Sequence, residues 1–508
     1  MLPSSPFIRF RLPAARRDRW ALTVALAGFV PGAWAAWSYH AAGLTLSHYD
    51  AKAHLVVARR VLDSLTPGWQ QIGAVWLPLP HLLNLLPAQV DLFYRTGAAA
   101  IAISMMAFAV AVFASARIIG QVTGSAAAAA AGGAVLALNQ NVLYLQATPM
   151  TEPLLLGLTL AGLSRLIDWV NRPAPHLARQ TGCLLAAAWL TRYEAWPVVI
   201  AAIGLAGVAR WRLGATPLEA ARDGARLALF PLAALAAFLL HSRLSVGEWF
   251  VAGGFYLADN PLDTGRPVRA AVTVWWGTHE VSSYPLLVAA AAGAAATACV
   301  GLARRERSPA LVTLALAAAA VLPWYAFHEG HPFRIRYMVP LIAAVAVSAG
   351  VGVGWLPGRA RLVGALALLG LVLAGGRPID LRAPMVVEAQ LDSANERERR
   401  QLTRLVVREY RGEPILASMA SLAHYMQELS ADGFAIRDFI HEGNGALWLD
   451  ALESPAPRAG WILMEELSEG GDVLARRARA HPEFLDGYVR VGSGGGVALY
   501  RRVPPRPR

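Results

Sequence analysis

Charged side chains are scarce in this chain of 508 residues: they make up 16% of it, whereas soluble proteins average about 25%. Lysine is nearly absent, because Lys52 is the only lysine among 46 residues that are Lys or Arg. The two cysteines, Cys183 and Cys299, lie in apolar runs and indicate nothing about the redox compartment. With a mean hydropathy of +0.42, the scarcity of charge argues against a soluble protein, and the length exceeds one ordinary domain core.

Long apolar runs are what the chain has instead. Several approach the roughly 20 residues that a helix needs to cross a bilayer, which predicts a polytopic α-helical membrane protein. We predict eleven spans, of which the fifth and sixth are short. They cover residues 20–40, 96–116, 125–143, 153–169, 181–191, 197–209, 227–241, 285–302, 309–327, 338–355 and 361–375.

The distribution of arginine predicts the orientation. If the spans alternate, almost all basic segments fall on one side, which the positive-inside rule assigns to the cytoplasm. The net charge of +12 therefore reflects topology and not nucleic-acid binding. We expect a multi-pass protein of the cytoplasmic (inner) membrane with its N-terminus inside and segments 41–94, 242–284 and 380–508 outside. The first run also fits a cleaved signal peptide, but its length and the spans that follow favour an uncleaved span.

The composition changes near residue 380. Helical patterns then alternate with short apolar runs, which is typical of a small α/β domain. We predict a membrane domain over 1–379, with a catalytic first outer loop at 41–94, and an extracytoplasmic α/β domain over 380–508. The glycine-rich run near 492–496 follows one strand-like run and precedes another, and it is not followed by the Lys-Ser/Thr of a phosphate loop. It is predicted to be a hairpin.

A dense polar cluster, SHYDAKAH at 47–54, follows the first span. Asp50 and His54 are four residues apart, so a helix would place them on one face. Asp50 is the candidate general base, and the plainer alternative is that it caps a surface helix. Tryptophans among prolines later in 41–94 suit a membrane interface, so we expect amphipathic helices lying on the outer surface there.

Glu152 stands at the predicted outer end of the fourth span. One interpretation is an acidic residue in the first turn of a helix, next to Pro153. The other is a second carboxylate that faces Asp50. Two such acids could hold a divalent metal with His48, His54 or His331, although nothing in the spacing demands a metal.

Arginine also occurs on the predicted outer side, where it is disfavoured. Arg334 and Arg336, beside Tyr337, either snorkel to the interface or bind a phosphate, which arginine contacts with two hydrogen bonds and a fixed charge. Arg192 and Glu194 either act in the same way or pair with each other.

Four segments, in this order and all on the predicted outer side, resemble the GT-C superfamily of polyprenyl-phosphate-sugar glycosyltransferases. The nearest branch is the protein O-mannosyltransferase and lipid A aminoarabinose transferase group, and the resemblance covers about residues 20–345. The segments are YD at 49–50, ATPMTEP at 147–153, TRYE at 191–194 and RYMVP at 336–340. The resemblance implies a catalytic aspartate at Asp50 and a donor-phosphate contact at Arg336 or Arg334. One branch uses a further acidic pair as a metal site, but no matching Asp-x-Asp occurs here, so a metal stays an open question.

The implied function is transfer of a hexose or pentose from a polyprenyl-phosphate carrier to a lipid, glycan or protein acceptor, with inversion. Asp50 would take the acceptor's proton, while Lys52, Arg334 and Arg336 would stabilise the charge of the departing phosphate. A transporter or flippase for a lipid-linked or anionic substrate is one alternative, and paired halves with broken helices would indicate it. A non-catalytic envelope assembly protein is the other, but it leaves the polar groups at several span ends unexplained.

Overall fold

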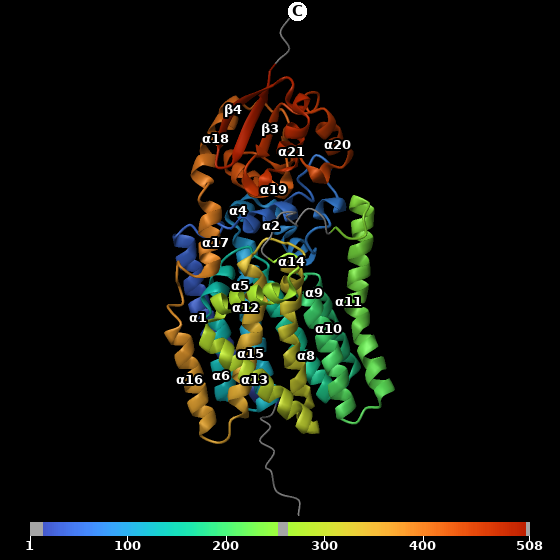
Figure 1. The fold of residues 1–508 in the computed structure, drawn as a ribbon, viewed down its shortest axis with the longest axis vertical. Coiled ribbons are helices and arrows are strands. Elements are labelled where there is room, and N and C mark those ends of the chain that lie inside the picture. Colours follow the sequence, from blue (N-terminus) through green and yellow to red (C-terminus); the bar gives the residue numbers. More distant parts are fainter. Residues whose placement is uncertain (1–13, 252–262, 504–508) are drawn as a thin grey trace, which may run out of the picture.

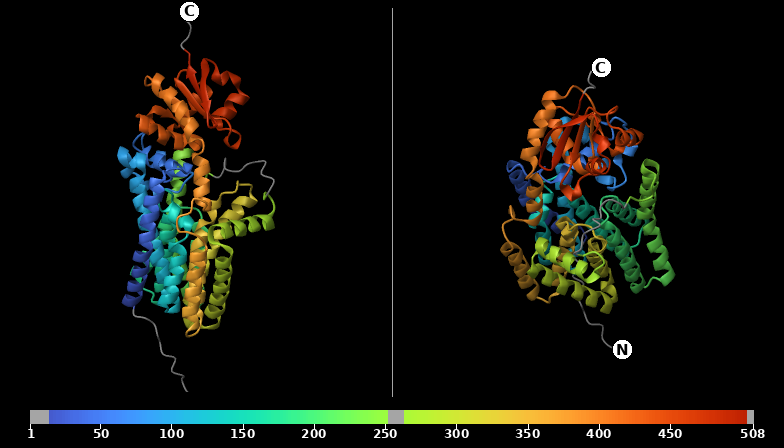
Figure 2. Two further views of the ribbon diagram at one scale, coloured as in Figure 1. Left: turned by 90° about the vertical axis from the view of Figure 1, so that its left-hand side faces the viewer. Right: turned by 45° about the horizontal axis from the view of Figure 1, so that its top comes forward.

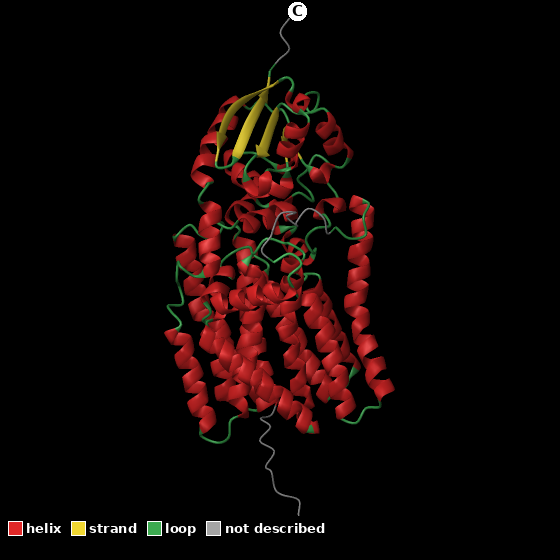
Figure 3. Cartoon of the chain, viewed as in Figure 1, coloured by secondary structure: helices red, strands yellow, loops and turns green. Residues whose placement is uncertain are grey.

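The computed structural model describes residues 14–251 and 263–503. It consists of a helical bundle, a layer of short helices at one end of that bundle, and a small domain on top of this layer (Figure 1). Within the described residues, strands occur only in that end domain (Figure 3).

Every predicted span corresponds to helical structure in the bundle. The bundle elements are α1 (Ala14–Ala41), α5 (Ala98–Thr123), α6 (Ala126–Ala137), α7 (Gln140–Leu145), α8 (Glu152–Asn171), α9 (Pro175–Trp189), α10 (Ala195–Arg212), α11 (Pro217–Val246), α13 (Tyr284–Ala303), η3 (Arg305–Ala320), α14 (Val321–His328), η4 (Ile335–Met338), α15 (Val339–Trp355) and α16 (Ala360–Ala374).

Seven helical segments of the described chain are long and apolar enough to cross a membrane, by length and composition, so this is a multi-pass membrane protein. Two further apolar helices, α6 and α16, are shorter, and the count of eleven spans stays a prediction. The third predicted span is broken at Asn139, because its side chain accepts hydrogen bonds from the backbone N–H groups of Asn141 and Val142 and so starts α7.

Small residues allow the bundle helices to approach closely. A Cβ atom on Gly157 of α8 would lie 2.7 Å from the carbonyl oxygen of Ala107 on α5. A Cβ atom on Gly132 of α6 would lie 3.0 Å from the Cα of Gly350 on α15. Helix contacts built on glycine and alanine are typical of membrane bundles, where backbone proximity replaces the hydrophobic effect as the source of packing energy.

The predicted outer loop at 242–284 contains a helix that the sequence patterns did not indicate. Helix α12 (Pro267–Ser282) occupies its second half and runs crosswise to the bundle helices (Figure 1, Figure 2). Its apolar residues are interrupted by arginine, histidine and glutamate, so hydropathy alone did not reveal it. Residues 252–262 of this loop lie outside the described residues.

The layer between bundle and end domain is formed by residues 41–97. It contains α2 (Tyr49–Arg59), η1 (Trp69–Ile72), α3 (Leu79–Asn84), η2 (Pro87–Gln89) and α4 (Asp91–Thr96). The prediction of helices was correct, but α2 does not lie on the surface. Its residues Ala51 to Ala58 are all buried, because α2 packs against α19 (Met419–Leu429) of the end domain on one side and against α3 on another.

The end domain is a mixed α/β sheet domain, as predicted. Its further helices are α17 (Pro384–Ser393), α18 (Glu396–Glu409), α20 (Ala446–Glu453) and α21 (Val473–Ala480). Its strands are β1 (Ile415–Ala417), β2 (Phe439–Ile440), β3 (Trp461–Glu465), β4 (Tyr488–Gly494) and β5 (Val497–Arg502).

The five strands form one sheet in the order β2-β1-β3-β5-β4. β1 is parallel to both of its neighbours, β2 and β3. β5 is antiparallel to both of its neighbours, β3 and β4. The glycine-rich run thus closes a β4–β5 hairpin, as predicted. Helix α17 does not pack on the sheet but contacts α2, α7 and η4, so the segment that follows the last bundle helix returns to the layer that carries Asp50. The domain boundary at 380 stays a prediction.

Candidate active site

Asp50 lies in the first turn of α2. The Nδ1 atom of His48, the N-cap residue, accepts a hydrogen bond from the Asp50 backbone N–H at 3.1 Å. An acidic side chain in the first turn also suits the positive end of the helix dipole, but the capping residue of α2 is His48 and not Asp50. The carboxylate has a second partner, however, because it forms an ion pair with Nη1 of Arg336 from η4. The sequence distance is 286 residues, and the family resemblance had named both residues.

The electrostatics of this pair set the protonation state of Asp50. Burial favours the neutral acid, but the Arg336 guanidinium outweighs it and holds the pKa of Asp50 below its ordinary range. Asp50 is therefore a carboxylate at neutral pH. Arg336 keeps spare donor capacity, since its buried Nε–H finds no hydrogen-bond acceptor in the described part of the chain.

Glu152, Arg192 and Glu194 form a second buried group. Arg192 Nη1 lies 2.9 Å from Glu152 Oε1, and Arg192 Nη2 lies 2.6 Å from Glu194 Oε1. The Glu152 contact is a charge pair without good hydrogen-bond alignment. Glu152 begins α8, Arg192 follows α9, and Glu194 precedes α10, so one arginine ties three helix ends together. Arg192 thus pairs with acids in this structure.

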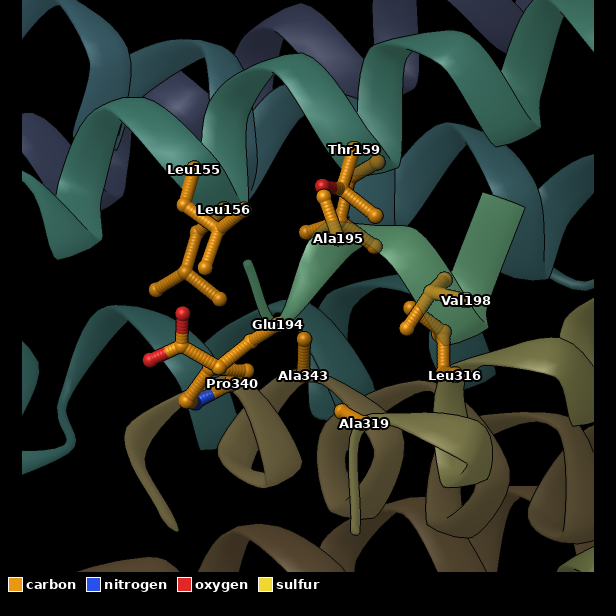
Figure 4. Close-up of a pocket in the computed structure, with 11 residues that line it drawn as sticks. Leu155, Leu156, Thr159, Glu194, Ala195, Val198, Leu316, Ala319, Pro340 and Ala343 are labelled. Atoms are coloured by element: carbon orange, nitrogen blue, oxygen red, sulfur yellow. The ribbon is translucent and has the colours of Figure 1, made fainter. Parts of the chain in front are cut away.

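A narrow apolar crevice with a cavity volume of about 10 Å³ adjoins this group. Figure 4 shows the Glu194 carboxylate at its edge, with leucine, alanine and valine side chains around it. The crevice lies between α8, α10, η3 and α15, inside the bundle. It places an apolar space directly beside a buried ionic group.

The predicted metal ligands do not converge. In the described chain, no group of three or more His, Cys, Asp or Glu side chains is arranged to hold a metal ion. His48 faces α17, where its Nε2 lies 3.4 Å from Glu388 Oε1. His54 contacts Nε2 of His81 through its Nδ1 at 3.0 Å, and burial lowers its pKa to about 3. Asp50 and Glu152 are each committed to an arginine, so we derive no step through a metal.

Of the remaining predicted residues, Tyr337 and Arg334 lie near Arg336, whereas Lys52 contacts the end domain. Tyr337 donates or accepts a hydrogen bond with Nε2 of His331 at 3.2 Å and lies beside the Arg336 guanidinium. Arg334 is partly buried two residues before Arg336. Lys52 points away from Arg336 into the end domain, where its Nζ lies 2.6 Å from Glu428 Oε1.

Three acids that surround α2 were not predicted from the sequence. Asp392 accepts a hydrogen bond from the Tyr49 backbone N–H at 3.0 Å, Glu388 contacts His48, and Glu428 contacts Lys52. All three belong to the last quarter of the chain, which no motif connected to residue 50. The one available signal was the four-residue spacing of Glu388 and Asp392, which puts both on one face of α17.

Comparison with known proteins supports the fold. No family model matches the sequence, and no curated protein matches it. The structure is similar to that of ArnT from Cupriavidus metallidurans in the apo state, with 13% identity, a TM-score of 0.54, and coverage of 89% of this chain and 93% of that one. It is also similar to ArnT bound to undecaprenyl phosphate, with 14% identity, a TM-score of 0.56, and coverage of 96% and 98%. ArnT is a lipid A aminoarabinose transferase, and the chain therefore has the GT-C fold that its four segments predicted.

Proposed function

We propose that the protein is a membrane glycosyltransferase that moves a sugar from a polyprenyl-phosphate carrier to an acceptor at the outer face of the cytoplasmic membrane. One observation carries the proposal: Asp50 and Arg336, a base and a phosphate ligand, meet at the junction of bundle and end domain. The fold around them is similar to that of ArnT, whose structure has been solved with bound undecaprenyl phosphate.

The chemistry requires one base and one anion site. The acceptor hydroxyl oxygen attacks the anomeric carbon while the Asp50 carboxylate takes its proton. The bond from that carbon to the phosphate oxygen breaks on the opposite face, and its electron pair leaves with the lipid phosphate, so the anomeric configuration inverts. Arg336 contacts the phosphate, with Arg334 as the second candidate, and stabilises the charge that develops there.

The donor must displace Asp50 from Arg336. A carboxylate held by an arginine is a weak base, and a lipid phosphate can accept a bidentate contact from the same arginine. Once Arg336 turns to the phosphate, the pKa of Asp50 rises towards its ordinary value and its oxygen becomes free for the acceptor. The other ionisable groups near Asp50 are His48 just before α2, His54 on α2, Tyr337 of η4, Asp392 on α17 and His424 on α19. Donor binding thus activates the base.

The test is transfer by the purified full-length protein, given a panel of polyprenyl-phosphate sugars and glycan, lipid or peptide acceptors. We expect one donor to support transfer, with inversion in the product and loss of transfer in Asp50→Asn. Movement of undecaprenyl phosphate across vesicles without transfer from any donor would instead identify a flippase. Failure to bind undecaprenyl phosphate at all would overturn the proposal and leave the assembly-protein alternative.

A further inference from the structure

Helix α2 has charged side chains on two opposite sides. Successive helical residues are about 100° apart, so Asp50 and Lys52 project about 200° apart around the axis. Asp50 meets Arg336 of the bundle, and Lys52 meets Glu428 of the end domain. The helix that carries the proposed base therefore forms ion pairs with the bundle on one side and with the end domain on the other.

The contacts on the Lys52 side form a closed cluster. Glu428 Oε1 accepts from Lys52 Nζ at 2.6 Å and from Arg399 Nη2 at 3.0 Å. Arg399 Nη1 donates to the hydroxyl of Tyr49 at 3.1 Å, and the Tyr49 ring stacks on His424 with centroids 3.9 Å apart. Lys52 is 4% exposed and Arg399 is 1% exposed, so water cannot replace these partners.

Among the residues that the structure describes, Glu428 is the only acid that forms an ion pair with Lys52 or Arg399. His424 adds no third charge, because burial, with Arg399 and Lys52 nearby, lowers its pKa well below the usual value. A buried charge that loses its partner is strongly destabilising, and two like charges left facing each other are worse. Lys52 is also the only lysine of the chain, and an ammonium is a compact point charge where a guanidinium needs a planar fork of space.

We propose that Lys52 and Glu428 are positioning residues: through this pair, the end domain sets the placement of α2 and so of Asp50. The inference rests on the proposed transferase function and replaces a donor-phosphate role for Lys52. The first turn of α2 is held in the same way, because Asp392 of α17 binds the Tyr49 backbone N–H and Glu388 contacts His48. Displacement of a reacting group by about 1 Å can cost on the order of a hundredfold in rate.

The experiment compares Glu428→Gln, Lys52→Met and the double variant in the full-length protein. Glu409→Gln is the matched control, since Glu409 pairs with Arg501 on the exposed surface of the same domain. We expect Glu428→Gln to lower kcat by about ten- to a hundredfold with little change in the KM for donor. Lys52→Met should be milder, because Glu428 keeps Arg399.

Non-additivity is the decisive result. The double variant should be more active and melt at a higher temperature than Glu428→Gln, because one of the two unpaired cations is gone. In an Asp50→Asn background, Glu428→Gln should barely change the residual transfer, since it acts through Asp50; a purely structural role would lower both backgrounds alike.

If the wild type is active, three outcomes would overturn the inference. The first is additive losses in the double variant, and the second is wild-type kcat in Glu428→Gln. The third is a selective rise in donor KM in Lys52→Met, which would make Lys52 a donor contact. An inactive wild type would overturn the proposed function and this positioning role with it. The order of melting temperatures would then still show whether the ionic cluster exists.

Discussion

Replacing Arg336 by alanine tests the proposed anion site. Arg336 is largely buried, with one guanidinium nitrogen on Asp50 and a buried Nε–H without an acceptor in the described chain. A hydrogen bond to a charged group contributes about 1.5–3 kcal/mol. Because about 1.4 kcal/mol corresponds to a factor of ten, losing one such bond should weaken donor binding about 10- to 140-fold.

The assay is titration of the detergent-solubilised protein with undecaprenyl phosphate, and the control is Arg266→Ala. Arg266 is exposed at the start of α12. Its replacement by alanine removes one positive charge from the chain without changing the Asp50–Arg336 pair. Its donor affinity should match the wild type. Equal affinity in Arg336→Ala and wild type would refute the assignment, and the same titration of Arg334→Ala would then decide whether the neighbouring arginine is the ligand.

The same variant has a distinct pH signature. In the free wild type, Arg336 lowers the pKa of Asp50. Asp50 therefore stays ionised at pH values below about 3.9, the ordinary pKa of an aspartate. The profile of kcat/KM reports the free enzyme and that of kcat the donor complex. If the donor draws Arg336 away, the acidic limb of kcat should lie at higher pH than that of kcat/KM. In Arg336→Ala the two limbs should coincide, and wild-type limbs that coincide would refute the exchange.

Further predictions concern the base, the buried acids, stability and topology. Asp50→Asn should reduce transfer by about 10²–10⁴-fold with donor binding retained, which single-turnover assays and titration would separate. Glu152→Gln should lower the melting temperature and leave donor affinity nearly unchanged, because Arg192 keeps its ion pair with Glu194. A chelator should leave wild-type activity unchanged. The Asp50–Arg336 pair should stabilise the fold above about pH 3.9, the unfolded pKa, and lose this effect as pH falls through the lower folded pKa, measurable as melting temperature against pH. With the native cysteines replaced, Ser454→Cys should label from outside intact cells and Ala360→Cys only after permeabilisation; the reverse pattern would contradict the topology.

The sequence predicted the bundle well because apolar length is a strong signal. Its failures have local causes. Asn139 breaks one apolar run by capping a new helix, and α12 is too mixed for hydropathy to detect. The prediction of a surface helix is wrong for α2 because its partner, α19, lies more than 300 residues away along the chain. A helix with few long apolar residues does not reveal that both of its sides are covered.

The site was predictable only as far as motifs reach. Asp50 and Arg336 were correctly expected on the same side of the bundle, since each stands at the end of a span. The expectation that Lys52 stabilises the departing phosphate takes no account of helix geometry, because residues two positions apart on a helix point in nearly opposite directions. No sequence pattern pointed to Glu428, because a single acidic residue on a helix of the end domain is usually a solvated surface charge.

One physical constraint accounts for the arrangement on both sides of α2. A half-buried layer between a membrane bundle and a second domain cannot leave charges unpaired, and an arginine carries a permanent charge. Some acid must therefore occupy Arg336 in the free protein, and Asp50 is that acid. In the proposed mechanism, Asp50 holds Arg336 until the donor phosphate binds, which keeps the pair neutral and the base weak. Binding of the phosphate would then change both conditions together. This coupling requires α2 to stay in place when Asp50 lets go of Arg336, which the contacts of Glu428, Asp392 and Glu388 on its remaining sides provide.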